Sequence, residues 1–201
     1  MPALNPITPV TLRGEHATLE PLSISHLDAL REAVADGELW KLWYTNVPTP
    51  DQLPAEIERR LALQETGKMQ PFTVRRNDTG ATCGMTSYMD IDAPNRRLEI
   101  GSTWIAASAH RSGINTESKL MLLHHAFDAL DCNAVEFRTH WMNHQSRAAI
   151  ARLGAKQDGV LRSHRIMADG SLRDTVVFSI IAPEWPAVRS HLLYKLERAG
   201  I

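Results

Sequence analysis

A glycine-containing segment near the middle of the chain has the residue types of a phosphate-binding loop. It reads His110-Arg111-Ser112-Gly113-Ile114-Asn115-Thr116 and joins an expected strand to an expected helix. A helix start presents unpaired N–H groups and a positive dipole end, which together favour an anion. Gly113 would let the backbone approach that anion closely, and Arg111 adds a fixed positive charge. The competing interpretation is an ordinary tight strand-to-helix connection. The segment is neither G-x-x-x-x-G-K-[ST] nor G-x-G-x-x-G, so nucleotide hydrolysis and Rossmann-type dinucleotide binding lose support.

The elements around this loop are predicted from hydrophobic periodicity and turn residues. Strands are expected at 10–13, 17–22, 70–76, 81–91, 97–105, 134–140, 160–167 and 172–181. Helices are expected from a capping box at 25–28 to about 37, from Thr49 or Pro54 to about 67, at 116–130, at 145–153 and from 183 onward. This order predicts one domain, residues 1–201, with a mixed α/β sheet, an antiparallel meander and helices on both faces.

Composition limits the class of protein. The 201 residues, 43% of them hydrophobic, can bury one sizeable core. The formal net charge of -1 argues against a protein that mainly binds nucleic acid or an anionic membrane. Two cysteines are too few for a disulfide framework, the N-terminus lacks a signal-peptide pattern, and the apolar runs are too short to span a bilayer. We therefore expect a cytoplasmic protein with no nucleic-acid or membrane partner.

An ordered set of motifs extends the phosphate-binding hypothesis. Leu98-Glu99-Ile100-Gly101 and Trp104-Ile105-Ala106 precede the loop, and Asn143-x-x-Ser146-Arg147 and Leu153-Gly154 follow it. This order and spacing resembles the GNAT superfamily of acetyltransferases, especially the branch that includes RimJ- and RimL-type ribosomal-protein N-terminal acetyltransferases. Leu19-Glu20-Pro21-Leu22 resembles the same branch, so the resemblance covers nearly the whole chain.

The resemblance implies a GNAT-like, mostly antiparallel sheet and acetyl transfer from acetyl-CoA to a primary amine by direct attack on the thioester. The amine would lie on a protein or peptide N-terminus or on a small molecule. The strand ending at Ile105 should splay from the strand beginning near Ala134, with pantetheine in the gap and a backbone N–H near Ile105 polarising the thioester carbonyl. The implied cofactor-binding residues are Trp104, Ile105, Ala106, His110, Arg111, Ser112, Gly113, Ile114, Asn115, Thr116, Asn143 and Arg147.

The sequence departs from the family pattern at three positions. His110 stands where Gln or Arg is usual, and Asn115 stands where Gly or Ala is usual. Backbone amides do most of the binding, so we still expect the loop to bind the pyrophosphate. Ile150 occupies the position of the Tyr that in many members protonates the leaving thiolate. Ser146 or water would supply that proton, although a CoA thiolate leaves readily enough without a dedicated acid.

Acetyl transfer to an amine also requires a base, and Glu99 is the candidate. It lies on the strand that leads to the expected thioester site, at a position where some family members place a catalytic or substrate-orienting glutamate. Ser102 and Thr103 are close enough in sequence to hold a relay water. The competing interpretation is that Glu99 pairs with Arg96 or another cation on the sheet.

Aromatic residues are the candidates for the acceptor pocket. Trp40, Trp43 and Tyr44 are spaced i, i+3 and i+4, so one helical turn would place the three rings on one side. Tyr88 would face the same cavity. The alternative is a local hydrophobic cluster that closes the core, which is favoured for Trp40.

Other functional classes have weaker support. The nine histidines lack ligand-like spacing, so no metal is expected. Cys83 is expected to be a buried core residue, and Arg59 and Arg60 to form a solvated helix face. A non-catalytic acyl-CoA-binding sensor is the main alternative function, and an adaptor that uses the aromatic surface near Trp43 is the next. The last helix and the 160–181 hairpin would suit a homodimer interface.

Overall fold

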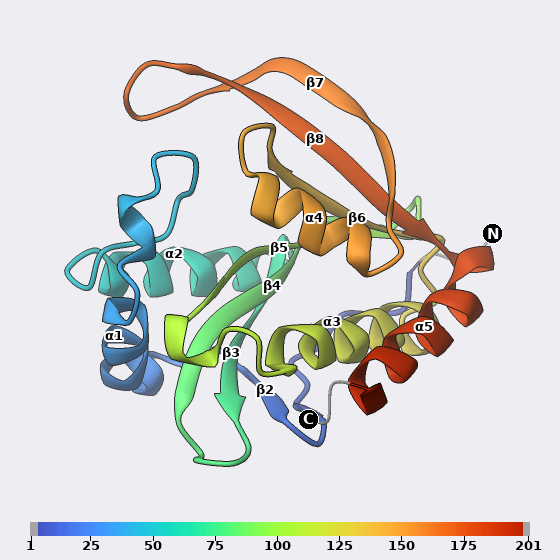
Figure 1. The fold of residues 1–201 in the computed structure, drawn as a ribbon, viewed down its shortest axis with the longest axis horizontal. Helices are drawn as coiled ribbons and strands as arrows, with labels where there is room; N and C mark the ends of the chain where they lie inside the picture. The colour runs from blue at the N-terminus through green and yellow to red at the C-terminus, as the bar shows by residue number, and fades with distance from the viewer. Residues whose placement is uncertain (1–3, 199–201) are drawn as a thin grey trace.

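An eight-stranded sheet forms the centre of the protein (Figure 1). The computed structural model describes residues 4–198. Its strands are β1 (Leu12–Arg13), β2 (Ala17–Pro21), β3 (Met69–Arg76), β4 (Thr82–Asp92), β5 (Arg97–Ile105), β6 (Ala134–His140), β7 (Lys156–Ile166) and β8 (Leu172–Ile181). Its α-helices are α1 (Leu27–Ala35), α2 (Leu53–Glu65), α3 (Ile114–His124), α4 (His144–Arg152) and α5 (Trp185–Arg198). Short turns of helix are η1 (Ile24–His26), η2 (Leu39–Lys41), η3 (Ala107–Ala109), the π-helical η4 (His125–Ala129) and η5 (Ala182–Glu184).

The strand order creates a gap in the middle of the sheet. The order is β1-β2-β3-β4-β5-β6-β8-β7, and each neighbouring pair is antiparallel except β5 and β6. The parallel pair is joined at three positions, from Arg97↔Ala134 to Glu99↔Glu136. Both strands then continue, β5 to Ile105 and β6 to His140, with no further pairing between them in the described chain. The predicted mixed, mostly antiparallel fold with a splayed strand pair is confirmed.

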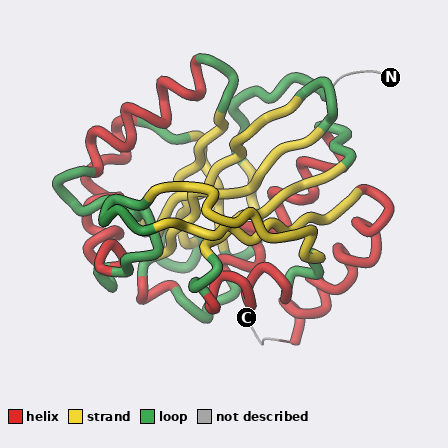
Figure 2. Tube along the Cα trace, turned by 90° about the horizontal axis from the view of Figure 1, so that it is seen from above, coloured by secondary structure: helices red, strands yellow, loops and turns green. Residues whose placement is uncertain are grey.

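Helices cover both faces of the sheet, as predicted (Figure 2). The hydroxyl of Tyr88 on β4 donates to the carbonyl of Leu122 on α3, so this face of β4 lies against α3. Its chain neighbour Ser87 accepts a hydrogen bond from Arg60 of α2, so the other face lies against α2. Successive side chains of a strand point to opposite faces, which is why these neighbours contact different helices.

One helix start differs from the sequence prediction, and a second agrees with one of its two alternatives. The capping box predicted at residues 25–28 is wrong. The capping residue is Ser23, which is extended and whose side chain accepts a hydrogen bond from the N–H of Ser25 at the start of η1. Thr49 and Gln52 do form the predicted reciprocal bonds, at 3.1 and 3.3 Å. They close the turn before the helix, and α2 itself begins at Leu53 with a proline in its first turn, in line with the alternative start at Pro54.

A buried carboxylate fixes the first strands to α3. Glu117 is 6% exposed and accepts the backbone N–H groups of Glu15, His16 and Ala17 at 2.7 to 2.8 Å. A Cβ on Gly14 would lie 2.3 Å from the carboxyl carbon of Glu117, so glycine is the residue that fits beside this group. The segment from 14 to 17 is thereby held over the first turns of α3.

No helix within residues 4–198 has the length and apolar character needed to cross a membrane. A cytoplasmic location stays a prediction, as do the single domain and the homodimer.

Candidate active site

The unpaired edge of β5 presents a backbone donor to the gap. Gly84 of β4 lies opposite Ile105, and the N–H of Ala106 donates to the carbonyl of Cys83 at 2.8 Å. In an antiparallel pair this pattern turns the N–H and C=O of the opposed residue away from the partner strand. The N–H of Ile105 therefore points to the side from which β6 has separated, where a donor near Ile105 was expected.

A bulge in β5 sets the direction of this edge. Ser102 has φ of +48°, and the register between β4 and β5 shifts beside it. Arg60 of α2 fixes the bulge, because its guanidinium donates to the carbonyl of Ser102 at 3.2 Å and to the hydroxyl of Ser87 at 3.1 Å. Arg60 is 2% exposed and also bonds Glu56 at 2.7 Å. The prediction of a solvated Arg60 was wrong, although Arg59 does lie on the exposed side.

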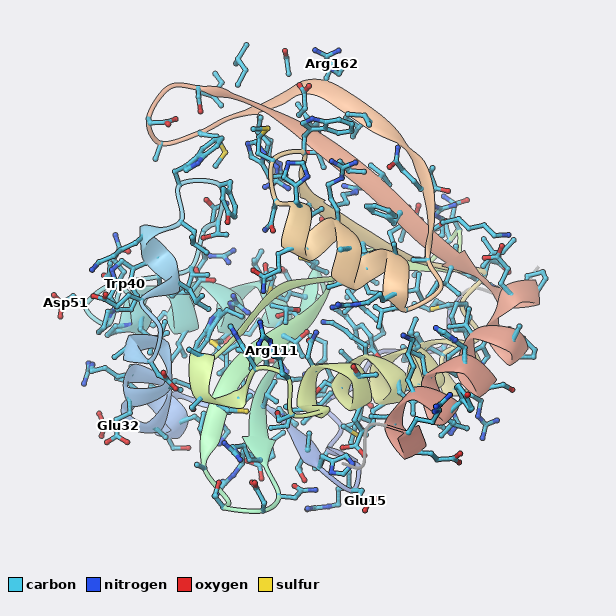
Figure 3. The ribbon with its side chains drawn as sticks, in the orientation of Figure 1. Glu15, Glu32, Trp40, Asp51, Arg111 and Arg162 are labelled. Carbon is cyan, nitrogen blue, oxygen red and sulfur yellow. The ribbon has the colours of Figure 1, made fainter. Side chains whose placement is uncertain are left out.

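The loop before α3 has the backbone shape of an anion site. Arg111 and Gly113 both have positive φ, +60° and +76°. The first helical bond of α3 runs from the N–H of Glu117 to the carbonyl of Gly113, so the N–H groups of Ile114, Asn115 and Thr116 have no acceptor within the helix. Figure 3 shows Arg111 above the start of α3. An anion at this point would meet both backbone donors and a cation.

Two side chains of the loop already have partners. His110 Nε2 donates to the carbonyl of Ile105 at 2.9 Å, and the Ser112 hydroxyl donates to the carbonyl of Ala109. His110 thus ties the loop to the end of β5 and does not point its imidazole N–H at an anion. This contact gives a structural reason for histidine at a position where the family pattern has Gln or Arg.

The residues after β6 lie at the start of α4. Asn143 caps this helix by accepting the N–H of Ser146 at 2.9 Å. Arg147 stacks over the ring of Trp141 at 4.0 Å and donates to its carbonyl at 3.2 Å. A cleft of about 100 Å³ separates α3, α4 and α5 beside the loop; its lining includes Asn115, Thr116, Arg152 and Lys195. The side-chain oxygen of Asn143 is therefore occupied by the helix cap. Cofactor binding by Asn143 and Arg147 stays a prediction, as does proton donation by Ser146.

Glu99, the candidate base, is the last residue of β5 that pairs with β6 before the gap. Its side chain is 7% exposed, and a Cβ on Gly101 would fall 2.6 Å from Glu99 Oε1, so the carboxyl lies over position 101 in the direction of the gap. Burial raises the pKa of Glu99 to about 7, although the nearby Arg138 opposes the shift. Arg138 Nε stands 3.6 Å from Glu99 Oε2. Arg96, the other candidate partner, binds Asp131.

Thr103 is not a relay for Glu99. Its hydroxyl accepts from Lys119 Nζ at 2.8 Å, and Lys119 also bonds Thr86 at 3.1 Å. Thr86 and Tyr88 share the face of β4 that lies against α3, which is opposite to the face of Glu99. Burial lowers the pKa of Lys119 to about 7. Nothing in the sequence indicated a buried lysine here, because Lys119 follows the polar residues Glu117 and Ser118 in the first turns of the helix.

The aromatic candidates separate in the structure. Trp43 and Tyr44 contact each other at 5.6 Å between ring centroids, and both approach His140 at the end of β6, at 5.1 and 6.5 Å. Trp40 instead packs against the core, because η2 ends at Lys41 and no helical turn aligns the three rings. Tyr88 is fully buried against α3. Tyr88 is therefore wrong as an acceptor-site residue. Trp40 has the core packing favoured for it, and its contact with an acceptor stays a prediction. Trp43 and Tyr44 flank the same face as Glu99.

Two other features lie away from this site. A hollow of about 350 Å³ lies on β1 to β3, remote from the gap, and is lined mainly by polar and charged side chains. Burial raises the pKa of Cys83 to about 11, which agrees with its prediction as an unreactive core residue. Within residues 4–198 no three His, Cys, Asp or Glu side chains gather as metal ligands.

Comparison with known proteins agrees with this geometry. Residues 16–156 match the family model described as the acetyltransferase (GNAT) domain. The chain belongs to the GNAT acetyltransferase family. It is 35% identical over 106 residues to the "Putative ribosomal N-acetyltransferase YdaF" of Bacillus subtilis, a match that covers 53% of this chain and 57% of that relative.

Solved GNAT structures share the fold over most of the chain. A GCN5-related N-acetyltransferase from Brucella melitensis superposes with a TM-score of 0.87 at 26% identity, covering 98% of this chain and 89% of that one. Mycobacterium smegmatis RimJ, solved in complex with CoA-disulfide, superposes with a TM-score of 0.77 at 25% identity, covering 98% of both chains. The predicted resemblance to the branch that includes RimJ is confirmed.

Proposed function

We propose that this GNAT protein transfers an acetyl group from acetyl-CoA to a primary amine, carried by a protein or peptide N-terminus or by a small molecule. The observation that carries the proposal is the free edge of β5. After Glu99 the strand leaves β6, and the N–H of Ile105 points into a gap that opens near the first turn of α3. The family, and the CoA-disulfide bound by RimJ, support acetyl-CoA as the donor.

The residues at the gap fit this donor. Pantetheine carries amides that would pair with the free peptide groups of β5, as an added strand does. The N–H groups at the start of α3 and the guanidinium of Arg111 would bind the pyrophosphate. Donation by Ile105 would stabilise the negative charge that develops on the thioester carbonyl oxygen during attack.

Glu99 would supply the base. A carboxylate with a pKa of about 7 is ionised in roughly half of the molecules at neutral pH and can take a proton from the acceptor ammonium, directly or through water. The freed nitrogen lone pair then attacks the acetyl carbon. The C–N bond forms as the C–S bond breaks. The nitrogen loses its second proton to water, and Ser146 or water gives a proton to the sulfur.

The test is amine-dependent release of free CoA thiol, with the acetylated product identified by mass spectrometry. We expect free CoA and acetylated amine to appear in equal amounts with at least one acceptor from a panel of peptides and small amines. Binding of acetyl-CoA without turnover across the panel would contradict the enzyme proposal and favour the sensor. Failure to bind acetyl-CoA at millimolar concentration would favour the adaptor.

A further inference from the structure

Basic side chains gather on the sheet face that carries Glu99. Arg138 and His140 lie on β6, and Arg173 lies on the neighbouring β8. Register places their side chains on one face, because His140 stands opposite Thr175 and Arg173 Nε donates to the Thr175 hydroxyl at 3.0 Å. The β7–β8 hairpin that carries Arg173 arches beyond the rest of the sheet in Figure 1.

Two arginines of the β7–β8 hairpin lack an acidic partner in the part of the chain that the structure describes. Arg165 of β7 stands directly opposite Arg173 of β8, an arrangement of like charges that weakens a strand pair. Within residues 4–198, neither guanidinium has a carboxylate within 4.0 Å. Burial, and then the charge of Arg165, lower the pKa of Arg173, but a guanidinium stays charged at neutral pH. By contrast Arg162, on the same hairpin, is paired with Asp174 at 2.5 Å.

Buried donors on the same face also lack acceptors. His140 is 5% exposed, and its Nδ1 accepts the N–H of Met142 at 3.0 Å, so Nε2 carries the proton of the neutral ring. That Nε2–H has no acceptor in the described chain, and neither has Nε of Arg138 beside Glu99. Most buried polar groups in proteins are hydrogen-bonded, so unpartnered donors in a candidate site indicate a ligand that accepts.

We propose that the acceptor amine also carries a carboxylate, and that this face binds the amine at Glu99 and the carboxylate at Arg173 and His140. The inference rests on the proposed acetyl transfer and names its substrate class. Arginine presents a planar fork that matches a carboxylate, and the buried imidazole N–H supplies a further donor.

The charges on this face favour a ligand with a carboxylate group. Arg138 contacts Asp90 and Glu136, and Glu136 also binds Arg97. Among the described residues, Arg165 and Arg173 have no such acidic partner, so positive charge is in excess at the hairpin end of this face. A free amino acid, a dipeptide, or a peptide N-terminus followed by an acidic residue would each offer an amine with a nearby carboxylate.

Matched acceptors test the inference. One pair is a dipeptide with a free carboxylate and its C-terminal amide; the other is a peptide amide with glutamate or glutamine as its second residue. We expect kcat/KM to be at least tenfold higher for the carboxylate member of one pair, which is the size of effect expected from one charge-assisted hydrogen bond. The pair that discriminates identifies the source of the carboxylate.

Variants on the hairpin locate the effect. Arg173→Gln should lower kcat/KM for the carboxylate acceptor by about 10- to 100-fold, mainly through KM, and leave the amide acceptor unchanged. Arg162→Gln is the control, because Arg162 is 79% exposed, points outward in Figure 3 and is already paired. It should keep the preference. Arg173→Lys keeps the positive charge but lacks the planar guanidinium, so it should keep part of the preference for the carboxylate acceptor. This variant tests the site if Arg173→Gln folds poorly.

Equal kcat/KM for both members of both pairs would overturn the inference, as would an Arg173→Gln variant that loses activity equally toward carboxylate and amide acceptors. Either result leaves acetyl transfer itself in place. If acetyl-CoA binds and no amine is acetylated, the proposed function fails and the inference fails with it, so the two failures are distinguishable.

Discussion

Replacing Glu99 with glutamine is expected to lower kcat/KM for acetyl transfer at pH 7 by about 10²- to 10⁴-fold, the usual range for loss of a positioned general base. Glutamine keeps the shape of the side chain but cannot take a proton. In the wild type, kcat/KM should rise with pH and level off above about 7, because burial raises the pKa of Glu99 to that value. An unchanged rate in Glu99→Gln would contradict the role of this residue as the base.

The same substitution should stabilise the folded protein at alkaline pH. The unfolded carboxyl titrates near 4.5 and the folded one near 7, so between these values the folded state holds a proton that the unfolded state has released. The free energy of unfolding of the wild type therefore falls as pH rises through this window, by on the order of 3 kcal/mol in all.

Glu99→Gln removes this pH-dependent loss, so its stability relative to the wild type should grow between pH 5 and pH 8, on the order of a few kcal/mol at most. Urea denaturation at the two pH values measures it. Glu58→Gln is the matched control, because Glu58 is exposed on α2 and should show no comparable change. A difference between Glu99→Gln and wild type that is the same at both pH values would show that the carboxyl is not held in its neutral form.

Replacing Glu117 with alanine is expected to lower the free energy of unfolding by about 2–4 kcal/mol, because it leaves buried backbone donors without an acceptor. The carboxylate binds the N–H groups of Glu15, His16 and Ala17 at 2.7 to 2.8 Å, joining residues that are about 100 positions apart in the sequence. Glu117→Gln keeps one acceptor oxygen and should lose less.

Chemical denaturation at neutral pH checks this effect. Glu58→Ala is the control, since an exposed helix residue should change stability by no more than about 0.5 kcal/mol. A loss for Glu117→Ala no larger than that of the control would mean that the segment from 14 to 17 is held in place by its strand pairing and not by this carboxylate.

The elements were predictable because local patterns determine them. The strands at 97–105, 134–140 and 172–181 have the predicted bounds, since apolar runs between turn residues leave little freedom there. The gap between β5 and β6 came from the family resemblance, because nothing in the periodicity of either strand shows where their pairing stops.

The face of the strand or helix on which an individual side chain lies was harder to predict. Alternation along β4 shows that Tyr88 and its neighbours face opposite sides, but it does not show which side α3 covers, and Tyr88 was assigned to the wrong one. A signal for Arg60 was present, because Leu53, Ile57 and Arg60 share one helix stripe at i, i+4 and i+7 and all are buried.

The neighbours of Glu99 could not be found from sequence. Only the strand order of the sheet places Arg138 and His140 of β6 and Arg173 of β8 on the face of Glu99. His140 stands at the end of a predicted strand without any ligand-like spacing. Its importance comes from burial and from an N–H without an acceptor, and both are properties of the packed structure.

The most direct test of the central claim is a calorimetric titration of the wild type, Gly113→Trp and Gly80→Trp with acetyl-CoA. Gly113 and Gly80 both have positive φ, +76° and +70°, and a Cβ on Gly80 meets nothing within 4 Å, so the second variant has a similar backbone penalty away from the loop. We predict binding to the wild type and Gly80→Trp, weakened at least tenfold in Gly113→Trp, on the order of 1.4 kcal/mol. No binding to the wild type at millimolar acetyl-CoA, or equal binding by all three proteins, would contradict the account.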